Sequence, residues 1–205
     1  MKMNYSQLIN NLVSEGVLKT PALVEAFREI DRADFVPSGE RKYAYLDTAL
    51  PIGYDQTISQ PYTVAFMLEL LNPQKGEKIL DVGSGSGWTT ALLACIVGGK
   101  GLVMGVEVVP ELVALGQNNL AKYEFPHARI EQSSAKLGCP EHAPYDKILV
   151  SAAGNEVPQE LTEQLKIGGV MVLPVGDALW KVTCVSKNKT KTETFEGFAF
   201  VPLIR

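Results

Sequence analysis

The sequence predicts an α/β fold built on a doubly wound, mostly parallel sheet of seven strands, with N-terminal helices before it and an antiparallel strand pair at its end. Three observations lead to this prediction. Short apolar runs alternate with helical periodicity through the middle of the chain, which gives parallel strands with helices on both faces. A glycine-rich turn at 83–87 joins the first of these strands to a helix. The last two strands leave no room for a helix between them, so they must pair antiparallel.

The N-terminal region begins with two expected helices. Apolar residues recur at helical spacing over 5–13, and Thr20 followed by Pro21 is typical of an N-cap with proline at the first helical position. Residues 41–60 then show no clear periodicity. A long irregular segment inside a domain is usually functional or disordered, and the apolar content of this one argues against disorder. We therefore expect 41–60 to serve the function of the protein.

The remaining elements follow one another closely. A helix is expected over 61–71, ended by Asn72 and Pro73. The expected strands are 79–82, 102–108, 128–132, 147–152, 170–174, 181–186 and 194–201, and the expected helices between them are 88–97, 110–123 and 158–165. The whole chain, 1–205, is expected to form one domain, in which 1–72 supplies the N-terminal helices and the irregular loop and 73–205 the α/β core.

Composition excludes several classes of function. The net charge is −4, and the run Lys187-Asn-Lys189-Thr-Lys191 is the one basic cluster, which we expect to be a solvated turn. A nucleic-acid partner, which needs clustered Lys and Arg, is therefore not expected. No run approaches the ~18 apolar residues of a membrane span, and the N-terminus lacks an apolar signal core. A cytoplasmic protein without a membrane partner is expected.

Cysteine and histidine usage predicts no metal site. The three cysteines are widely spaced and odd in number, which favours buried free thiols in a reducing compartment. Both histidines, His127 and His142, lie in predicted loops with no cysteine or carboxylate partner at ligand spacing. Surface roles are expected for both.

The glycine-rich turn indicates a nucleotide-like ligand. An apolar run ends at Asp81 and is followed by Gly83, Gly85 and Gly87, and then by a helical pattern. Glycine lets the backbone approach a ligand closely, and the N–H groups at a helix start favour polar or anionic groups. The spacing is G-x-G-x-G, shorter than the G-x-G-x-x-G of dinucleotide sites, which disfavours a nicotinamide dehydrogenase. A ligand-free glycine turn is the simplest alternative.

Two acids narrow the choice of ligand. Glu107 stands at the carboxyl end of the second strand, where a carboxylate can accept hydrogen bonds from both hydroxyls of a ribose. Asp81, just before the glycines, is placed to meet a polar or cationic group such as an ammonium. An amino acid linked to a sulfonium carries such an ammonium group, whereas the pyrophosphate of a dinucleotide is negatively charged. Asp81 therefore fits the first kind of ligand better than the second. The sequence therefore favours S-adenosylmethionine as the cofactor.

The irregular segment points to the reaction. From Asp47 through Gln56-Thr57-Ile58-Ser59-Gln60-Pro61 it closely resembles the signature of protein-L-isoaspartate O-methyltransferases, and the resemblance continues through 81–87 to the terminal Phe200-Val201-Pro202-Leu203. The resemblance implies a Rossmann-like methyltransferase fold and a repair enzyme. Such an enzyme esterifies the α-carboxylate of L-isoaspartyl residues in damaged proteins and releases S-adenosylhomocysteine. A monomer is expected.

The resemblance also implies roles for single residues. Ser59 would be the active-site residue, and the cofactor-binding residues would be Gln56, Thr57, Ile58, Ser59, Asp81, Gly83, Ser84, Gly85, Gly87, Glu107, Val108, Ser134 and Ala135. Relatives usually carry an acid where Ser134 stands, so we expect weaker cofactor binding by about 1 kcal/mol, the scale of one hydrogen bond.

The implied chemistry suits these residue types. A carboxylate is ionised at pH 7 and is already a nucleophile, so no general base is required, and catalysis reduces to positioning and exclusion of water. Ser59 would orient one carboxylate oxygen, or alternatively cap the helix that begins at Pro61. Asp55 places negative charge near a site meant for a carboxylate. A methyltransferase for another carboxylate, a small molecule or RNA, and a cofactor-binding adaptor without catalysis, are the alternatives.

Overall fold

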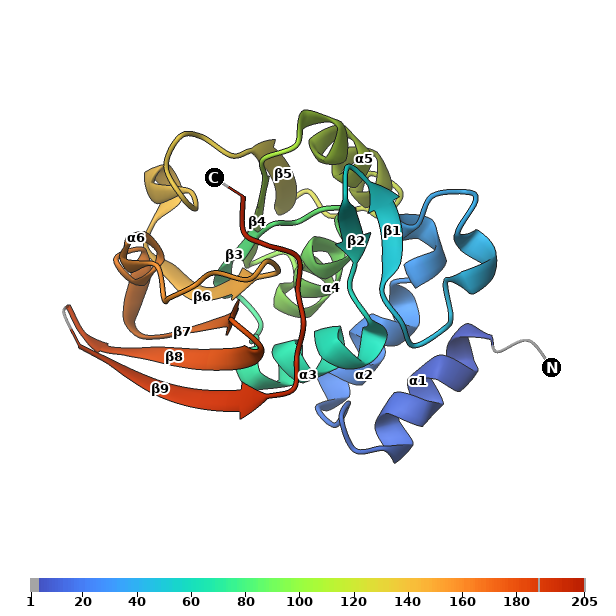
Figure 1. Ribbon diagram of the computed structural model, residues 1–205, viewed down its shortest axis with the longest axis horizontal. Helices are drawn as coiled ribbons and strands as arrows, with labels where there is room; N and C mark the ends of the chain where they lie inside the picture. Colours follow the sequence, from blue (N-terminus) through green and yellow to red (C-terminus); the bar gives the residue numbers. More distant parts are fainter. Residues whose placement is uncertain (1–3, 188, 205) are drawn as a thin grey trace.

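The computed structural model describes residues 4–187 and 189–204, which contain a seven-stranded sheet in the order β5-β4-β3-β6-β7-β8-β9 (Figure 1). Its strands are β3 Lys78–Val82, β4 Leu102–Glu107, β5 Ala128–Gln132, β6 Tyr145–Val150, β7 Leu165–Val175, β8 Ala178–Ser186 and β9 Lys189–Glu196. The strands from β5 to β7 are parallel, and β8 and β9 run antiparallel to their neighbours. The predicted fold class is confirmed.

The strand order creates a switch point in the middle of the sheet. The chain runs outward from β3 through β4 to β5 and then returns to place β6 on the other side of β3. In open α/β sheets, ligands bind outside the carboxyl ends of the strands at such a point. The segments that follow β3, β4 and β6 are therefore brought together at one edge.

The two faces of the sheet are covered unequally. The helices are α1 Tyr5–Ser14, α2 Pro21–Glu29, α3 Pro61–Leu71, α4 Trp88–Val97, α5 Pro110–Leu120 and α6 Gln159–Thr162, with 3-10 turns η1 Arg32–Phe35, η2 Arg41–Tyr43 and η3 Pro140–His142. Helices α1 to α5 share one hydrophobic core with one face of the sheet, whereas the other face packs on α6 and the segment around η3. Helix α6 is shorter than predicted because β7 already begins at Leu165.

The N-terminal helices pack directly on the α/β core. Leu8 of α1 and Leu149 of β6 belong to the same buried cluster. Thr20 stands at the N-cap of α2 as predicted, but its hydroxyl does not cap the helix and instead donates to Glu69 of α3 at 2.7 Å. The division of the chain at residue 72 stays a prediction.

The irregular segment contains a hairpin that its sequence conceals. Strands β1 Leu50–Gly53 and β2 Gln56–Ile58 pair antiparallel, and Gly53, Tyr54 and Asp55 in the turn all have positive φ. The usual sequence signal of a short hairpin turn is Asn-Gly or Asp-Gly, and neither pair occurs in this turn. The hairpin lies against the glycine-rich turn, since a Cβ on Gly85 would stand 3.2 Å from Cδ1 of Ile52 in β1.

The last strand begins earlier than the sequence suggests. It is β9 Lys189–Glu196, and the prediction of a strand over 194–201 is wrong, because the apolar residues 198–201 leave the sheet. Strand β9 is an exposed edge whose lysine and glutamate side chains hide its strand pattern. Lys189 and Lys191 therefore lie in a strand rather than in a turn, and Asn188 falls outside the described residues.

The C-terminal segment crosses the carboxyl edge of the sheet. Figure 1 shows it running from the end of β9 across the front of β6 toward β4. Two backbone hydrogen bonds to Ala153 hold the segment there. The Leu203 N–H donates to the Ala153 carbonyl, and the Ala153 N–H donates to the Val201 carbonyl. Separately, no helix within 4–187 and 189–204 combines the length and hydrophobicity that crossing a bilayer requires.

Candidate active site

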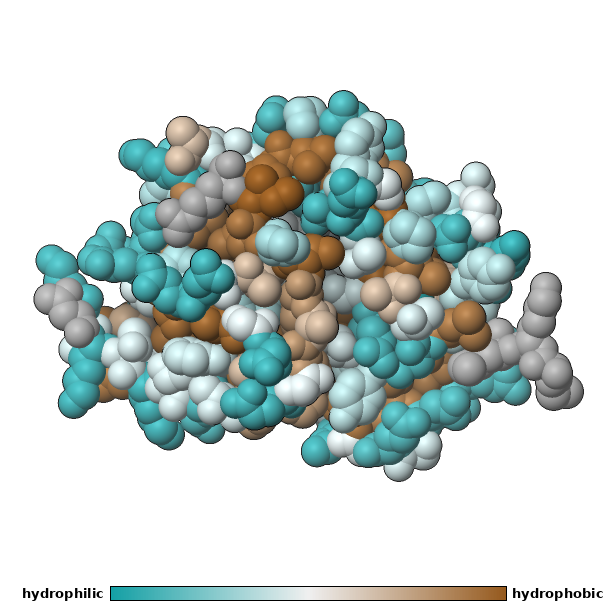
Figure 2. Space-filling view, in the orientation of Figure 1, coloured by the Kyte–Doolittle hydropathy of each residue, from teal (hydrophilic) through white to brown (hydrophobic). Residues whose placement is uncertain are grey.

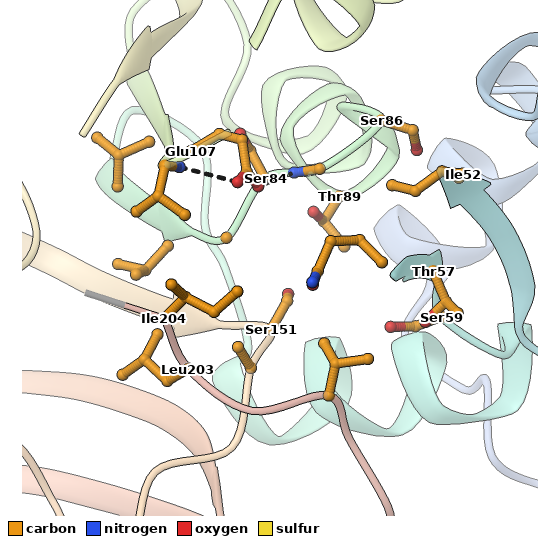
Figure 3. A pocket seen from close by; sticks show the side chains of 18 of the residues that line it. Ile52, Thr57, Ser59, Ser84, Ser86, Thr89, Glu107, Ser151, Leu203 and Ile204 are labelled. Atoms are coloured by element: carbon orange, nitrogen blue, oxygen red, sulfur yellow. Dashed lines mark hydrogen bonds between the residues drawn. The ribbon is translucent and has the colours of Figure 1, made fainter. Parts of the chain in front are cut away.

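A cavity lies where the strand order predicts, outside the carboxyl ends of β3 and β4. It encloses about 810 Å³ when the open space at its mouth is counted. Its walls come from the hairpin, from the turn after β3, from the end of β4 and from the C-terminal segment (Figure 3). Figure 2 shows hydrophobic side chains gathered at its mouth, where Val108, Leu203 and Ile204 line it.

The three glycines of the turn have different roles. Gly83 and Gly85 line the cavity and have φ of 76° and 50°, which glycine adopts without strain. Gly87 does not line the cavity. A Cβ there would stand 3.0 Å from the carbonyl oxygen of Gly116 in α5, so Gly87 allows α4 and α5 to pack closely. Gly87 therefore has a packing role, and its predicted role at the cofactor stays a prediction.

Glu107 organises the cavity wall with its carboxylate. The side chain is only 6% exposed, and its Oε2 accepts from the Gly85 N–H at 3.0 Å. Its Oε1 accepts from the N–H groups of Val108 and Val109 at 2.8 and 3.1 Å. The dashed line beside Glu107 in Figure 3 marks a bond of this carboxylate. Because each carboxylate oxygen can accept about two bonds, Oε2 can take another from a ligand hydroxyl.

Asp81 lies behind the cavity wall and not in it. Its Oδ2 accepts from the hydroxyls of Thr89 and Thr90, each at 2.7 Å, and Oδ1 has no hydrogen-bond partner among the described residues. Only Thr89 of this trio lines the cavity. Burial raises the pKa of Asp81 to about 6, against the lowering effect of the two hydroxyls and with a further rise from Glu107.

This raised pKa predicts a pH-dependent stability. Because the folded pKa of about 6 exceeds the ordinary value of 3.8, native Asp81 binds more protons than the unfolded chain between these values. The free energy of unfolding should therefore fall as pH rises from 4 to 7, by about 2 kcal/mol from this group. Urea unfolding of wild type and Asp81→Asn checks this, since the wild type should lose that amount relative to the variant. A difference that stays constant with pH would contradict the assignment.

Ser59 does not cap the helix that follows it. Gln60 occupies the N-cap of α3, and the Tyr62 N–H in the first turn is bound by Oδ1 of Asp47 at 2.8 Å. The alternative role of Ser59 as an N-cap is therefore wrong. Its hydroxyl instead points into the open space seen in Figure 3, where the hydroxyls of Thr89 and Ser151 also face inward.

A second hollow adjoins the cavity at Ser59. It is formed by the loop before β1, the start of α3 and the segment 196–201. Thr57, Ser59, Ser151 and Val201 line both spaces. A group bound in the second hollow can therefore meet the end of a ligand in the cavity, and Ser59 stands at that junction.

The other predicted residues divide between cavity and surroundings. Residues 56–59, Ser84 and Val108 line the cavity, and their contacts with a cofactor stay a prediction. Ser134 and Ala135 line a neighbouring hollow instead, and the cavity is lined by the preceding Ser133. Asp55, at the exposed hairpin turn, lines none of these spaces. The negative charge expected in the acceptor site is thus displaced to the surface.

Several lining residues escape the sequence prediction. Ser151 directly follows β6, and the rule that strand ends gather at the switch point could have found it. Val201 to Ile204 belong to a segment singled out only as part of the resemblance, and no local pattern shows that it folds back over the cavity.

One cluster between β5 and η3 contains groups that metals prefer. Atoms of Glu131, Cys139 and His142 lie within 4.8 Å of one another. The expectation that His142 has no such neighbours is wrong, because the loop after β5 brings them together. The Arg129 guanidinium contacts both His142, at 2.7 Å, and Glu131, at 2.8 Å, so a cationic group already occupies this position.

Comparison with known proteins decides the family. The sequence model of the protein-L-isoaspartate(D-aspartate) O-methyltransferase family matches residues 3–205. The chain belongs to this family. A protein-L-isoaspartate O-methyltransferase of Methanopyrus kandleri is 43% identical over 203 residues, 97% of this chain and 90% of the relative. One of Ignicoccus hospitalis is 39% identical, covering 100% of this chain and 99% of its own.

Solved structures agree with this protein-L-isoaspartate O-methyltransferase fold. A Plasmodium falciparum protein described as a putative protein-L-isoaspartate O-methyltransferase, in complex with S-adenosyl-L-homocysteine, has the same fold, with a TM-score of 0.88 at 24% identity over 98% of this chain and 99% of that one. Another protein-L-isoaspartate O-methyltransferase gives a TM-score of 0.88 at 27% identity and covers 98% and 66%. The resemblance seen in the sequence is confirmed.

Proposed function

We propose that this protein transfers a methyl group from S-adenosylmethionine to the α-carboxylate of L-isoaspartyl residues in damaged proteins. Its family membership supports the reaction. The observation that carries the proposal is the junction at Ser59, where the cavity bounded by Glu107 and the glycine-rich turn meets a second hollow. Residues 1–72 and 73–205 then share the acceptor side equally, and residues 73–205 supply most of the cofactor side.

The residues of the cavity fit S-adenosylmethionine. Glu107 has acceptor capacity left for ribose hydroxyls, and the backbone at Gly83 and Gly85 allows close approach of the amino-acid part. The hydroxyl of Ser84 is buried beside the cavity without a partner among the described residues, so a ligand group could satisfy it. When bound, the cofactor supplies an activated methyl group on a sulfonium.

The chain's own residues position the acceptor. An isoaspartyl carboxylate is ionised at neutral pH and needs no base. Ser59 would donate a hydrogen bond to one carboxylate oxygen and leave the other free to attack, and Ser151 lies at the same junction. The hairpin and the C-terminal segment close the cavity on two sides, which excludes competing water. Because both spaces are built within one chain, we also propose that a monomer suffices.

Methyl transfer to a synthetic peptide tests the proposal. The peptide carries one L-isoaspartyl residue, and its twin carries aspartate at the same position. With labelled cofactor, we expect label in the isoaspartyl peptide only. Equal labelling of both peptides would favour a less specific carboxyl methyltransferase. Labelling of neither, with intact cofactor binding, would favour an adaptor without catalysis.

Replacing Ser59 with alanine should slow the reaction without releasing the cofactor. A hydrogen bond to a charged group contributes about 1.5–3 kcal/mol, so kcat should fall about 10- to 100-fold. Affinity for S-adenosylhomocysteine should change less than about 3-fold, because Ser59 stands where the two spaces meet. Steady-state kinetics and calorimetry separate the two quantities. The exposed Ser38→Ala serves as control, and an unchanged kcat would remove Ser59 from the mechanism.

A further inference from the structure

Arg32 is a fully buried arginine behind the loop that carries Ser59. It lies in η1 at 0% exposure. Its guanidinium donates hydrogen bonds to five backbone carbonyls: Nη1 to Ala44 and Leu46 at 2.8 and 3.3 Å, and Nη2 to Thr48, Ile58 and Ser59 at 2.9, 3.5 and 3.0 Å. Within 4–187 and 189–204, no carboxylate lies within ion-pair distance of it.

Such a group carries its positive charge into the interior. Burying an unpaired cation is costly, and carbonyl dipoles offset that cost without cancelling the charge. Burial lowers the pKa of Arg32 to about 10, while Asp47 and Tyr5 act against this fall. The guanidinium therefore remains a cation at neutral pH.

The bonds of Arg32 fasten both ends of the hairpin segment. Three accepting carbonyls belong to residues 44–48, before β1, and two to Ile58, the last residue of β2, and Ser59, which follows it. The guanidinium also lies 5.4 Å from the ring centre of Trp88, the first residue of α4. Arg32 thus connects the loop at Ser59 to the helix that follows the glycine-rich turn.

The charge of Arg32 suits a carboxylate acceptor. Glu107 and Glu196 line the two spaces, whereas no lysine or arginine does so among the described residues. The Arg32 guanidinium contacts the Ser59 carbonyl itself, so its charge lies close to the point where the two spaces meet. Carbonyl and N–H of a trans peptide point in opposite directions, so the Gln60 N–H is turned away from Arg32. Gln60 lines the second hollow.

We propose that Arg32 is a positioning residue that fixes the acceptor loop and gives the Ser59 junction the positive potential that selects a carboxylate. This inference rests on the proposed methyl transfer to an isoaspartyl carboxylate. It makes two separable statements. The hydrogen bonds of Arg32 set the order of the loop, and its charge sets the preference for an ionised acceptor.

Two variants separate these statements. Arg32→Lys keeps the charge but loses the forked bonds, whereas Arg32→Gln loses both. Each is measured for binding of an isoaspartyl peptide and of a twin whose α-carboxylate is an uncharged amide, with S-adenosylhomocysteine present. We expect Arg32→Gln to lower the preference for the carboxylate about 10-fold, the scale of one charge at this range in a protein. Arg32→Lys should weaken both peptides equally and keep the preference.

Controls keep the test independent of general damage. Arg41→Gln removes an exposed arginine of the same region and should change neither quantity. Hydrogen exchange of the amides of residues 50–59 should be faster in both Arg32 variants, a readout that requires no substrate. Wild-type exchange rates in both would overturn the positioning role, and an unchanged preference in folded Arg32→Gln would overturn the electrostatic role. Wild type that methylates no isoaspartyl peptide refutes the proposed function instead, while the exchange measurement still decides the role of the hydrogen bonds.

Discussion

Replacing Gly87 with alanine should lower the free energy of unfolding by about 3 kcal/mol. Gly87 has φ of 88°, a conformation that costs a residue with a Cβ about 1–2 kcal/mol. The added Cβ would also stand 3.0 Å from the Gly116 carbonyl oxygen and 3.0 Å from Cδ1 of Ile130. The backbone at Gly116 cannot move without shifting α5, so overpacking adds about 1–3 kcal/mol. Urea unfolding measures the loss.

A second glycine separates strain from overpacking. Gly76 has φ of 82°, but a Cβ there would meet nothing within 4 Å. Gly76→Ala should therefore cost only about 1 kcal/mol, from the backbone conformation alone. Gly116→Ala tests the other component, because its Cβ would stand 2.9 Å from the Gly85 carbonyl oxygen. If Gly76→Ala and Gly87→Ala cost the same, close packing of α4 on α5 is not what requires glycine at 87.

The sequence predicts those parts of the fold that local patterns encode. The parallel strands follow from short apolar runs, and the turn at Gly83 and Gly85 follows from glycine spacing between a strand and a helix. The position of Glu107 at the cavity could be predicted because it ends a parallel strand, and ligands bind at the carboxyl ends of such strands. In each of these cases, residues that are close together in the sequence are sufficient to predict the feature.

What the sequence does not predict depends on contacts between distant residues. The hairpin of β1 and β2 lacks a turn signal, and Arg32, many residues earlier, holds its two ends. Gly87 serves packing because α5 passes beside it, which no spacing reveals. The return of Leu203 to Ala153 depends on where β9 ends, and the charged side chains of that edge strand hide its pattern.

Replacing Glu107 with glutamine should weaken cofactor binding about 100-fold while the fold is kept. Both oxygens of the carboxylate are used, Oε1 by the N–H groups of Val108 and Val109 and Oε2 by that of Gly85. Glutamine offers one oxygen and one amino group, and the amino group would face a backbone donor. The turn at Gly85 or the end of β4 then loses its acceptor. The lost bonds are charge-assisted, and two factors of ten correspond to about 2.8 kcal/mol.

Calorimetric titration with S-adenosylhomocysteine measures this effect without depending on turnover. Glu111→Gln is the matched control, since Glu111 is exposed in the first turn of α5 and lines neither space. Glu107→Asp makes a further distinction, because it keeps the charge but shortens the reach to Gly85 and to the proposed position of the ribose. If charge alone mattered, aspartate would bind nearly as well as wild type; we expect it to bind no better than glutamine. A loss below about 3-fold for Glu107→Gln would place the ribose elsewhere in the cavity.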